Sequence, residues 1–183
     1  SSDLQSDSDF ETQLIATGSH LSKKFGGTLE EIKKDGFNVS VTIPILGRKL
    51  SKEEISISIG KAIIRFSKAF KKLKPDILIV LGDRYEILAA TASAAILEIP
   101  IIHIHGGEIT LGSVDEVFRH SITKMANYHF VATREYRERV LRMGEEPNRV
   151  FNVGGLGVDN ILNTTLFEKN ELEKNLKIGR AHV

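Results

Sequence analysis

Carboxylates and imidazoles gather in short glycine-containing segments of this sequence. These segments are Gly82-Asp83-Arg84-Tyr85-Glu86, His103-Ile104-His105-Gly106-Gly107-Glu108 and Gly154-Gly155-Leu156-Gly157-Val158-Asp159, with a further run from Asp115-Glu116 to Arg119-His120. Carboxylates and imidazoles serve as general acids and bases. Backbone N–H groups of glycines and of helix N-termini bind phosphates and hydroxyls. The pattern therefore predicts proton transfer on a substrate that carries phosphate or sugar hydroxyls.

Three of the carboxylates, Asp83, Glu108 and Asp115, converge if the strands that hold their loops are neighbours. In a cluster of carboxylates, one group can hold a proton while another stays ionised. Removal and return of a proton at a sugar carbon requires such a combination. These three residues are therefore candidates for a catalytic acid and base.

The same residues also have structural explanations. Asp83 would cap a helix that begins at Tyr85. Asp115 and Glu116 lie in a first helical turn, where acidic residues are favoured. Asp115 and Arg119 are spaced i,i+4, which suits a solvated ion pair. The sequence leaves these alternatives open.

The histidines allow several interpretations. His103 and His105 alternate along a strand, so one faces inward, and His103 suits a structural role as well as a functional one. His120 and His129 are expected to be packed or surface residues. The His-x-His-x-x-Glu spacing also occurs in metallohydrolases, but no further ligand set accompanies it, and we expect no metal.

Helical and strand patterns alternate along the chain. The helix expected at 51–74 opens with a capping box of Ser51 and Glu54, and its apolar residues recur at helical spacing. Continuous apolar runs at 77–81 and 99–104 are typical of strands buried on both faces. Further strands are expected at 12–15, 37–44, 128–132 and 150–153, and further helices within 21–34 and at 85–97, 114–127, 133–143 and 156–166. This alternation predicts an α/β, Rossmann-like, doubly wound parallel sheet with its ligand at the carboxyl ends of the strands.

Composition excludes several classes of protein. The 183 residues suit one domain, and a net charge of +1 gives no electrostatic attraction to nucleic acid or an anionic membrane surface. The sequence has no cysteine, which excludes disulfides and thiolate metal sites and fits a cytoplasmic protein. The longest apolar run, 77–81, is too short to span a bilayer, and no signal-peptide pattern is present.

The two ends differ in character from the rest of the chain. Residues 1–4 and 178–183 resemble translated sequencing-adapter DNA, and we expect them to be non-native. Residues 5–167 are expected to form one incomplete domain. Charged residues are dense after Phe167, which indicates that 168–177 begin a connection to a further domain.

Taken in order, the motifs resemble those of the hydrolysing UDP-N-acetylglucosamine 2-epimerases. They are the segments at 82–86 and 101–108, then Asp115-Glu116-x-x-Arg119-His120-x-Ile122-Thr123-Lys124, and then Asn148-Arg149-Val150-Phe151-Asn152-Val153-Gly154. The resemblance extends over residues 13–163. It implies the N-terminal half of a two-domain GT-B fold, with the first strand missing and the substrate between two Rossmann-like domains.

The resemblance also implies a reaction. UDP-N-acetylglucosamine loses UDP and its C2 proton to give a glycal, and water adds to yield N-acetylmannosamine, without metal, nicotinamide or other cofactor. Such enzymes serve sialic-acid-type biosynthesis in bacteria and are often homodimers when full length. Because this chain lacks the second domain, we expect it to be inactive by itself.

The catalytic residues implied by the resemblance are Asp83, Asp115 and Glu116, to which we add Glu108 and His105. Several family members carry glutamate where this chain has His105, and an imidazole titrates near neutral pH. Glu108 is the nearest carboxylate that could compensate, so the role of His105 stays open. The substrate-binding residues are expected to be Arg84, Gly106, Gly107, Arg119, His120, Gly154 and Gly155.

Three other functions fit parts of this pattern. Within the family, a UDP-2,4-diacetamido-2,4,6-trideoxyhexose, which leads to legionaminic-type acids, would share the chemistry at C2. A GT-B glycosyltransferase would share the fold and the nucleotide but needs no base at C2, so deuterium from solvent at that carbon separates the two classes. In a binding module without catalysis, substitution of Asp83 or Asp115 would weaken binding and have no larger effect on turnover.

Overall fold

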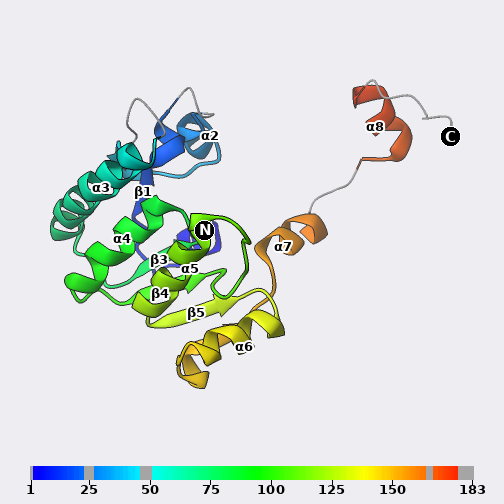
Figure 1. Cartoon of the computed structure of the whole chain (residues 1–183). Coiled ribbons are helices and arrows are strands. Elements are labelled where there is room, and N and C mark those ends of the chain that lie inside the picture. The colour runs from blue at the N-terminus through cyan, green and yellow to red at the C-terminus, as the bar shows by residue number, and fades with distance from the viewer. Residues whose placement is uncertain (1, 23–26, 46–50, 164–166, 177–183) are drawn as a thin grey trace.

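Helices and strands alternate in the computed structural model, which describes residues 2–22, 27–45, 51–163 and 167–176 (Figure 1). The strands are β1 Leu14–Thr17, β2 Val39–Ile43, β3 Leu78–Leu81, β4 Ile101–Ile104, β5 Tyr128–Val131 and β6 Val150–Asn152. The helices are α1 Ser2–Ser6, α2 Leu29–Lys34, α3 Lys52–Leu73, α4 Tyr85–Ile96, α5 Val114–Met125, α6 Arg134–Arg142, α7 Leu156–Asn163 and α8 Lys169–Leu176, with 3-10 turns η1 Gly18–Leu21 and η3 Pro147–Arg149. The expected non-native segment 178–183 lies outside the described residues.

Every strand pair is parallel, which confirms the predicted α/β class. The single continuous sheet that we expected is instead two sheets, β1-β2 and β3-β4-β5-β6. Both sheets contribute to one hydrophobic core, which contains Ile43 of β2 and Val80 of β3. The strand order β3-β4-β5-β6 aligns the ends of β3 and β4 as neighbours, and these ends carry most of the candidate site.

The four-stranded sheet buries only one face in the described part of the chain. Val80, His103 and His129 on that face are at most 5% exposed. On the other face, Ile79 is 42% exposed and Leu81 50% exposed. The prediction that strand 77–81 is buried on both faces was therefore wrong, because its apolar composition does not reveal whether a second layer covers the sheet.

Side-chain caps begin helices α3 and α6, and the cap of α3 lies where the sequence predicts it. The Ser51 hydroxyl accepts a hydrogen bond from the backbone N–H of Glu54 at 3.2 Å, and Thr133 caps α6 in the same way. The apolar stripe of α3, which includes Phe66 and Phe70, is buried in the core against α4. These caps satisfy N–H groups that have no partner within the helix, so they fix where each helix starts.

The C-terminal helices leave the sheet. In Figure 1, α7 follows β6 at the edge of the molecule and α8 lies away from both sheets. The segment 168–177, expected as a connection, contains α8. No helix in the described ranges has the length and apolar composition that a bilayer crossing requires.

Candidate functional site

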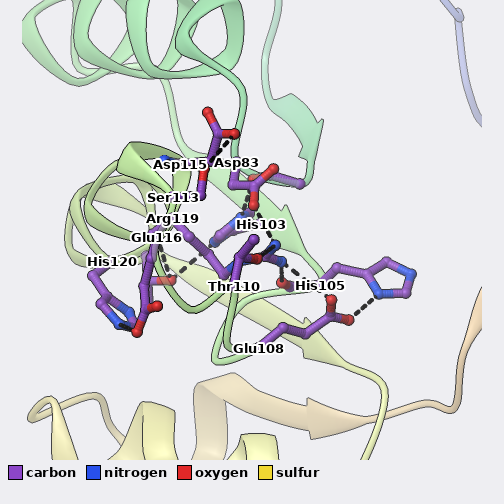
Figure 2. A network of polar contacts seen from close by, with 12 residues as sticks. Asp83, His103, His105, Glu108, Thr110, Ser113, Asp115, Glu116, Arg119 and His120 are labelled. Atoms are coloured by element: carbon purple, nitrogen blue, oxygen red, sulfur yellow. Dashed lines mark hydrogen bonds and ion pairs between the residues drawn. The ribbon is translucent and has the colours of Figure 1, made fainter.

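The loops after β3 and β4 meet the first turns of α5 at one edge of the four-stranded sheet (Figure 2). The two strands are paired, with Leu81 opposite Ile104, so the residues that follow them start side by side. Dashed bonds in Figure 2 join Asp83, Arg119, Glu108 and His105 into one network. Of the three carboxylates predicted to converge, Asp83 and Glu108 are therefore joined in one network, together with Arg119 and His105, whereas Asp115 forms no bond with it.

Arg119 is the centre of this network. Its side chain is 7% exposed and forms ion pairs with Asp83 and, at 3.2 Å, with Glu108. Its guanidinium also donates to the His105 carbonyl at 2.8 Å and to the Thr110 hydroxyl at 3.2 Å. One buried cation thus fixes carboxylates from two loops, since an ion pair removed from water is costly to break.

These contacts decide two of the alternatives left open by the sequence. Asp83 does not cap α4, because the N-cap residue is Arg84 and no side chain caps that helix. Arg119 does not pair with Asp115, four residues earlier on α5, but with Asp83 and Glu108. Local i,i+4 spacing was outweighed by the tertiary contact between α5 and the ends of β3 and β4.

His105 and Glu108 form a hydrogen-bonded dyad. The ring Nδ1 of His105 lies 2.5 Å from Oε1 of Glu108, and the two side chains are 22% and 26% exposed. His105 has a φ of 65°, a left-handed conformation that is costly for a residue with a Cβ. The bond from Arg119 to the His105 carbonyl holds this strained backbone in place.

Asp115 and Glu116 lie in the first turn of α5 but outside the network around Arg119. The Ser113 hydroxyl caps the helix by accepting from the N–H of Asp115, and it donates to the Asp115 carboxylate at 2.9 Å. Glu116 pairs with His120 on the same helix at 3.6 Å. Figure 2 shows this pair separate from the bonds that join Asp83, Arg119 and Glu108.

Arg84 is held by a buried carboxylate that sequence reasoning did not single out. Glu86, 3% exposed, accepts two hydrogen bonds from the Arg84 guanidinium, at 2.9 and 3.2 Å. This hydrogen bonding raises the pKa of Arg84. A Cβ at Gly18, at the end of β1, would overlap the Glu86 carboxylate, so only glycine fits there. Arg84 is thereby fixed at the carboxyl end of β3 with its side chain 58% exposed.

His103 is structural. It is fully buried, Nε2 donates to the Gly82 carbonyl at 2.9 Å, and Nδ1 lies 3.1 Å from the Thr123 hydroxyl. Burial lowers the pKa of His103 to about 4, so the ring is neutral at physiological pH. A Cβ at Gly106 would lie 3.1 Å from the His103 ring, which fixes the loop closely over it.

The remaining predicted glycines differ in their surroundings. Gly107 has a φ of 77°, and a Cβ there would lie 2.5 Å from the Tyr136 carbonyl on α6. Gly154 and Gly155 follow β6, which is separated from β4 by β5. No contact joins these two glycines to the network within the described residues.

A second polar cluster lies away from the site. His129 is fully buried, and its Nε2 is 3.2 Å from Glu145, which also pairs with Lys124 at 2.5 Å. Burial lowers the pKa of His129. Of the two possibilities that the sequence left for His129, packed or on the surface, the structure shows the packed one. Among the described residues, no group of three or more histidines, cysteines and acidic residues is arranged to hold a metal ion.

The chain matches known proteins along nearly its whole length. Residues 2–182 match the model of the family described as UDP-N-acetylglucosamine 2-epimerase. A GDP/UDP-N,N'-diacetylbacillosamine 2-epimerase (hydrolyzing) of Campylobacter jejuni is 44% identical over 96% of this chain and 46% of its own length. The polysialic acid biosynthesis protein P7 of Escherichia coli is 41% identical over 96% of the chain and 44% of its own.

The fold agrees with these sequence matches. The crystal structure of a UDP-N-acetylglucosamine 2-epimerase of Listeria monocytogenes, described as putative in that structure, superposes with a TM-score of 0.81 at 19% identity, over 97% of this chain and 47% of that one. The Neisseria meningitidis enzyme bound to UDP-GlcNAc superposes with a TM-score of 0.77 at 18% identity, over 97% and 48% of the two chains. This chain therefore spans less than half the length of these relatives. It belongs to the UDP-N-acetylglucosamine 2-epimerase family.

Proposed function

We propose that this chain forms the N-terminal half of a hydrolysing nucleotide-sugar 2-epimerase that acts on a UDP-sugar. The observation that carries the proposal is the network of Asp83, His105, Glu108 and Arg119 at the paired ends of β3 and β4. Open parallel α/β sheets bind ligands at this edge. The family match supports the same reaction class.

In the proposed reaction, a base removes the C2 proton while the C1–O bond to UDP breaks, which leaves a C1=C2 double bond. Water then adds its oxygen to C1, and a proton returns to C2 on the opposite face. Asp83, Asp115, Glu116, Glu108 and His105 are the candidates among which we seek the acid and the base and the residues that orient them. We assign no metal or organic cofactor to this reaction.

Substrate binding is proposed for both the charged side chains and the glycines of the site. Arg84, fixed by Glu86, presents a positive charge for the diphosphate at the carboxyl end of β3. Arg119 and His120 belong to the polar side of α5, and Gly106 and Gly107 bring backbone close to the site. Gly154 and Gly155 are proposed as contacts from the loop after β6.

The sugar is proposed to be N,N'-diacetylbacillosamine, carried on UDP. The relatives from Campylobacter jejuni and Legionella pneumophila, 44% and 40% identical, are both named for this sugar. UDP-N-acetylglucosamine is the second candidate, because the family description and the Neisseria meningitidis enzyme carry its name. Both sugars share the chemistry at C2, so the same site serves either.

The whole enzyme is proposed to have the two-domain GT-B fold, with a further parallel strand joining the two sheets. Support comes from β1 and β3, which are edge strands of separate sheets that share one core. A homodimer in the cytoplasm stays a prediction from the family resemblance.

The direct test is turnover by the full-length gene product that carries this chain. The purified protein is incubated separately with UDP-N,N'-diacetylbacillosamine, its GDP counterpart and UDP-N-acetylglucosamine, and the released nucleotide and sugar are measured. We expect free UDP and the 2-epimerised sugar, with the largest kcat/KM for the diacetamido substrate. Transfer of the sugar to an acceptor with retention at C2 would instead identify a glycosyltransferase, and binding without turnover a binding module.

A further inference from the structure

His105 is oriented through one of its ring nitrogens. Its Nδ1 lies 2.5 Å from Oε1 of Glu108, and Oε2 of Glu108 accepts from Arg119 at 3.2 Å. A carboxylate that pairs with arginine is ionised and can only accept, so Nδ1 carries the proton of this hydrogen bond. In the neutral ring, the lone pair is consequently on Nε2.

The second ring nitrogen of His105, Nε2, belongs to a partly exposed side chain. No described residue forms a hydrogen bond with it, and the His105 side chain is 22% exposed. The backbone at this residue is held in the left-handed region by the bond from Arg119 to its carbonyl. The ring and the backbone of His105 are thus both held in place. The lone pair on Nε2 therefore points in one fixed direction.

The other groups of the network are committed elsewhere. Asp83 forms an ion pair with Arg119, and Glu108 uses one oxygen for Arg119 and the other for His105. Outside the network, Glu116 pairs with His120. Of the network's titratable side chains, His105 is the one that is not paired with the Arg119 guanidinium, and its Nε2 has no hydrogen-bond partner among the described residues.

We infer that His105 Nε2 is the base that removes the C2 proton, and that Glu108 is a positioning residue and not a second acid or base. The inference rests on the proposed function. In this step Nε2 accepts the proton, the C2–H electron pair forms the C1=C2 bond, and UDP leaves with the electron pair of the C1–O bond. The imidazolium is stabilised by Glu108, as an orienting carboxylate does for a catalytic histidine. A second group returns a proton to the opposite face, because one imidazole contacts one face of the sugar.

A double-mutant cycle in the full-length gene product tests the division of roles. The variants are Glu108→Gln, His105→Glu and the two combined, with turnover of the best UDP-sugar as the readout. We expect Glu108→Gln alone to lower kcat by about 100-fold, the lower end of what a positioned acid–base group contributes, while KM changes by less than about threefold. A base at residue 105 that is itself a carboxylate needs no ring orientation. In the His105→Glu background, Glu108→Gln is therefore expected to change kcat by less than about threefold, or to raise it by removing a like charge.

The matched control is Glu146→Gln, which removes a carboxylate that is 63% exposed and paired with Arg149 on the surface. Its kcat and KM are expected to equal those of the unmodified enzyme. An equal loss from Glu108→Gln in both backgrounds would overturn the inference, because Glu108 would then act independently of the imidazole.

A second measurement does not depend on activity. Nitrogen-15 NMR of the full-length protein, with His105 assigned through the His105→Glu variant, reports which ring nitrogen carries the proton. We expect the Nδ1–H tautomer of His105 in the unmodified protein. In Glu108→Gln we expect the proportion of this tautomer to change. An Nε2–H tautomer in the unmodified protein would overturn the inference. If no UDP-sugar is turned over, the proposed function fails, while the tautomer still shows whether the dyad exists.

Discussion

Arg119 places two carboxylates that are 25 positions apart in the sequence, at residues 83 and 108, on one guanidinium. The five N–H donors of arginine in a planar fork make this possible, whereas lysine offers a point charge. Because Arg119 is 7% exposed, both carboxylates would lose an essential partner if it were removed. The residue should therefore matter for folding as well as for the site.

Replacing Arg119 by methionine should lower the free energy of unfolding by about 3 kcal/mol, the lower end of the cost of breaking a buried ion pair. We choose the lower end because Asp83 and Glu108 are 18% and 26% exposed and retain some solvation. Arg119→Lys should cost less, since it keeps the charge. Urea unfolding of the full-length protein measures both. Arg149→Met, at a surface pair, should cost under about 0.5 kcal/mol, and an Arg119→Met cost no larger than this would contradict the assignment.

His103 should make stability depend on pH. The pKa is about 4 in the folded protein against an ordinary value of 6.5, because burial disfavours the imidazolium. Between these pH values the unfolded chain binds more protons than the folded one, so stability falls as pH decreases from 6.5 to 4. The full contribution of about 3 kcal/mol is present above this window and is lost below it.

Urea unfolding at a series of pH values between these limits measures the slope. In His103→Gln the slope should decrease strongly, with a remainder from His129, whose pKa burial also lowers. A slope unaffected by His103→Gln would show that the ring is not buried as a neutral group.

Residue types at the site could be predicted from the sequence, but their partners could not. Asp83 and Glu108 were recognised because acidic residues next to glycines at strand ends suit catalysis, and Arg119 was recognised through the resemblance to the family. The local i,i+4 rule suggested Asp115 as the partner of Arg119, and only the pairing of β3 with β4 reveals the real partners. Glu86 was named within the segment 82–86 but given no role, because its burial under Gly18 depends on β1, far away in the sequence.

At the level of elements, the loop from β4 to α5 is fastened to α6. Arg139 donates to the Gly107 carbonyl, and Gly107 lies against the Tyr136 backbone. Because His105 and Glu108 flank this point, the contact between loop and helix sets the geometry of the dyad.

Substituting Gly107 by alanine tests this contact. The new Cβ would lie 2.5 Å from the Tyr136 carbonyl at a φ of 77°, so backbone must move. We expect a loss of stability above about 3 kcal/mol, from left-handed strain of about 1 kcal/mol plus the clash. Gly112→Ala is the matched control, since its φ is 78° with no atom within 4 Å, and it should cost only the strain. Thermal unfolding of both variants measures the loss of stability. An equal loss in Gly107→Ala and Gly112→Ala would contradict the close packing of Gly107 against Tyr136.

Elements themselves follow from local sequence more directly than their burial does. Ser51 was predicted as a cap and is a cap, because capping depends on residues three positions away. The 77–81 run was predicted as a strand, which is right, but as one buried on both faces, which is wrong. Burial depends on which layers cover the sheet, and that is not encoded within the strand.

On the scale of the whole molecule, we propose that the chain carries one side of a site. Its two sheets are separate, one sheet face exposes Ile79, Leu81 and Phe151, and its relatives are more than twice as long. We expect the 183-residue chain alone to release no UDP from any of the proposed substrates, while the full-length gene product does. Turnover by the short chain at the rate of the full-length protein would show that the site is complete without a second domain.

Proton abstraction at C2 is the central claim, and one measurement tests it most directly. The full-length gene product is incubated with its UDP-sugar in deuterated water, and the product is followed by proton NMR. We expect UDP and a 2-epimerised sugar with deuterium at C2, since the returned proton comes from solvent. Release of UDP with the original hydrogen retained at C2 and the configuration unchanged would contradict the account.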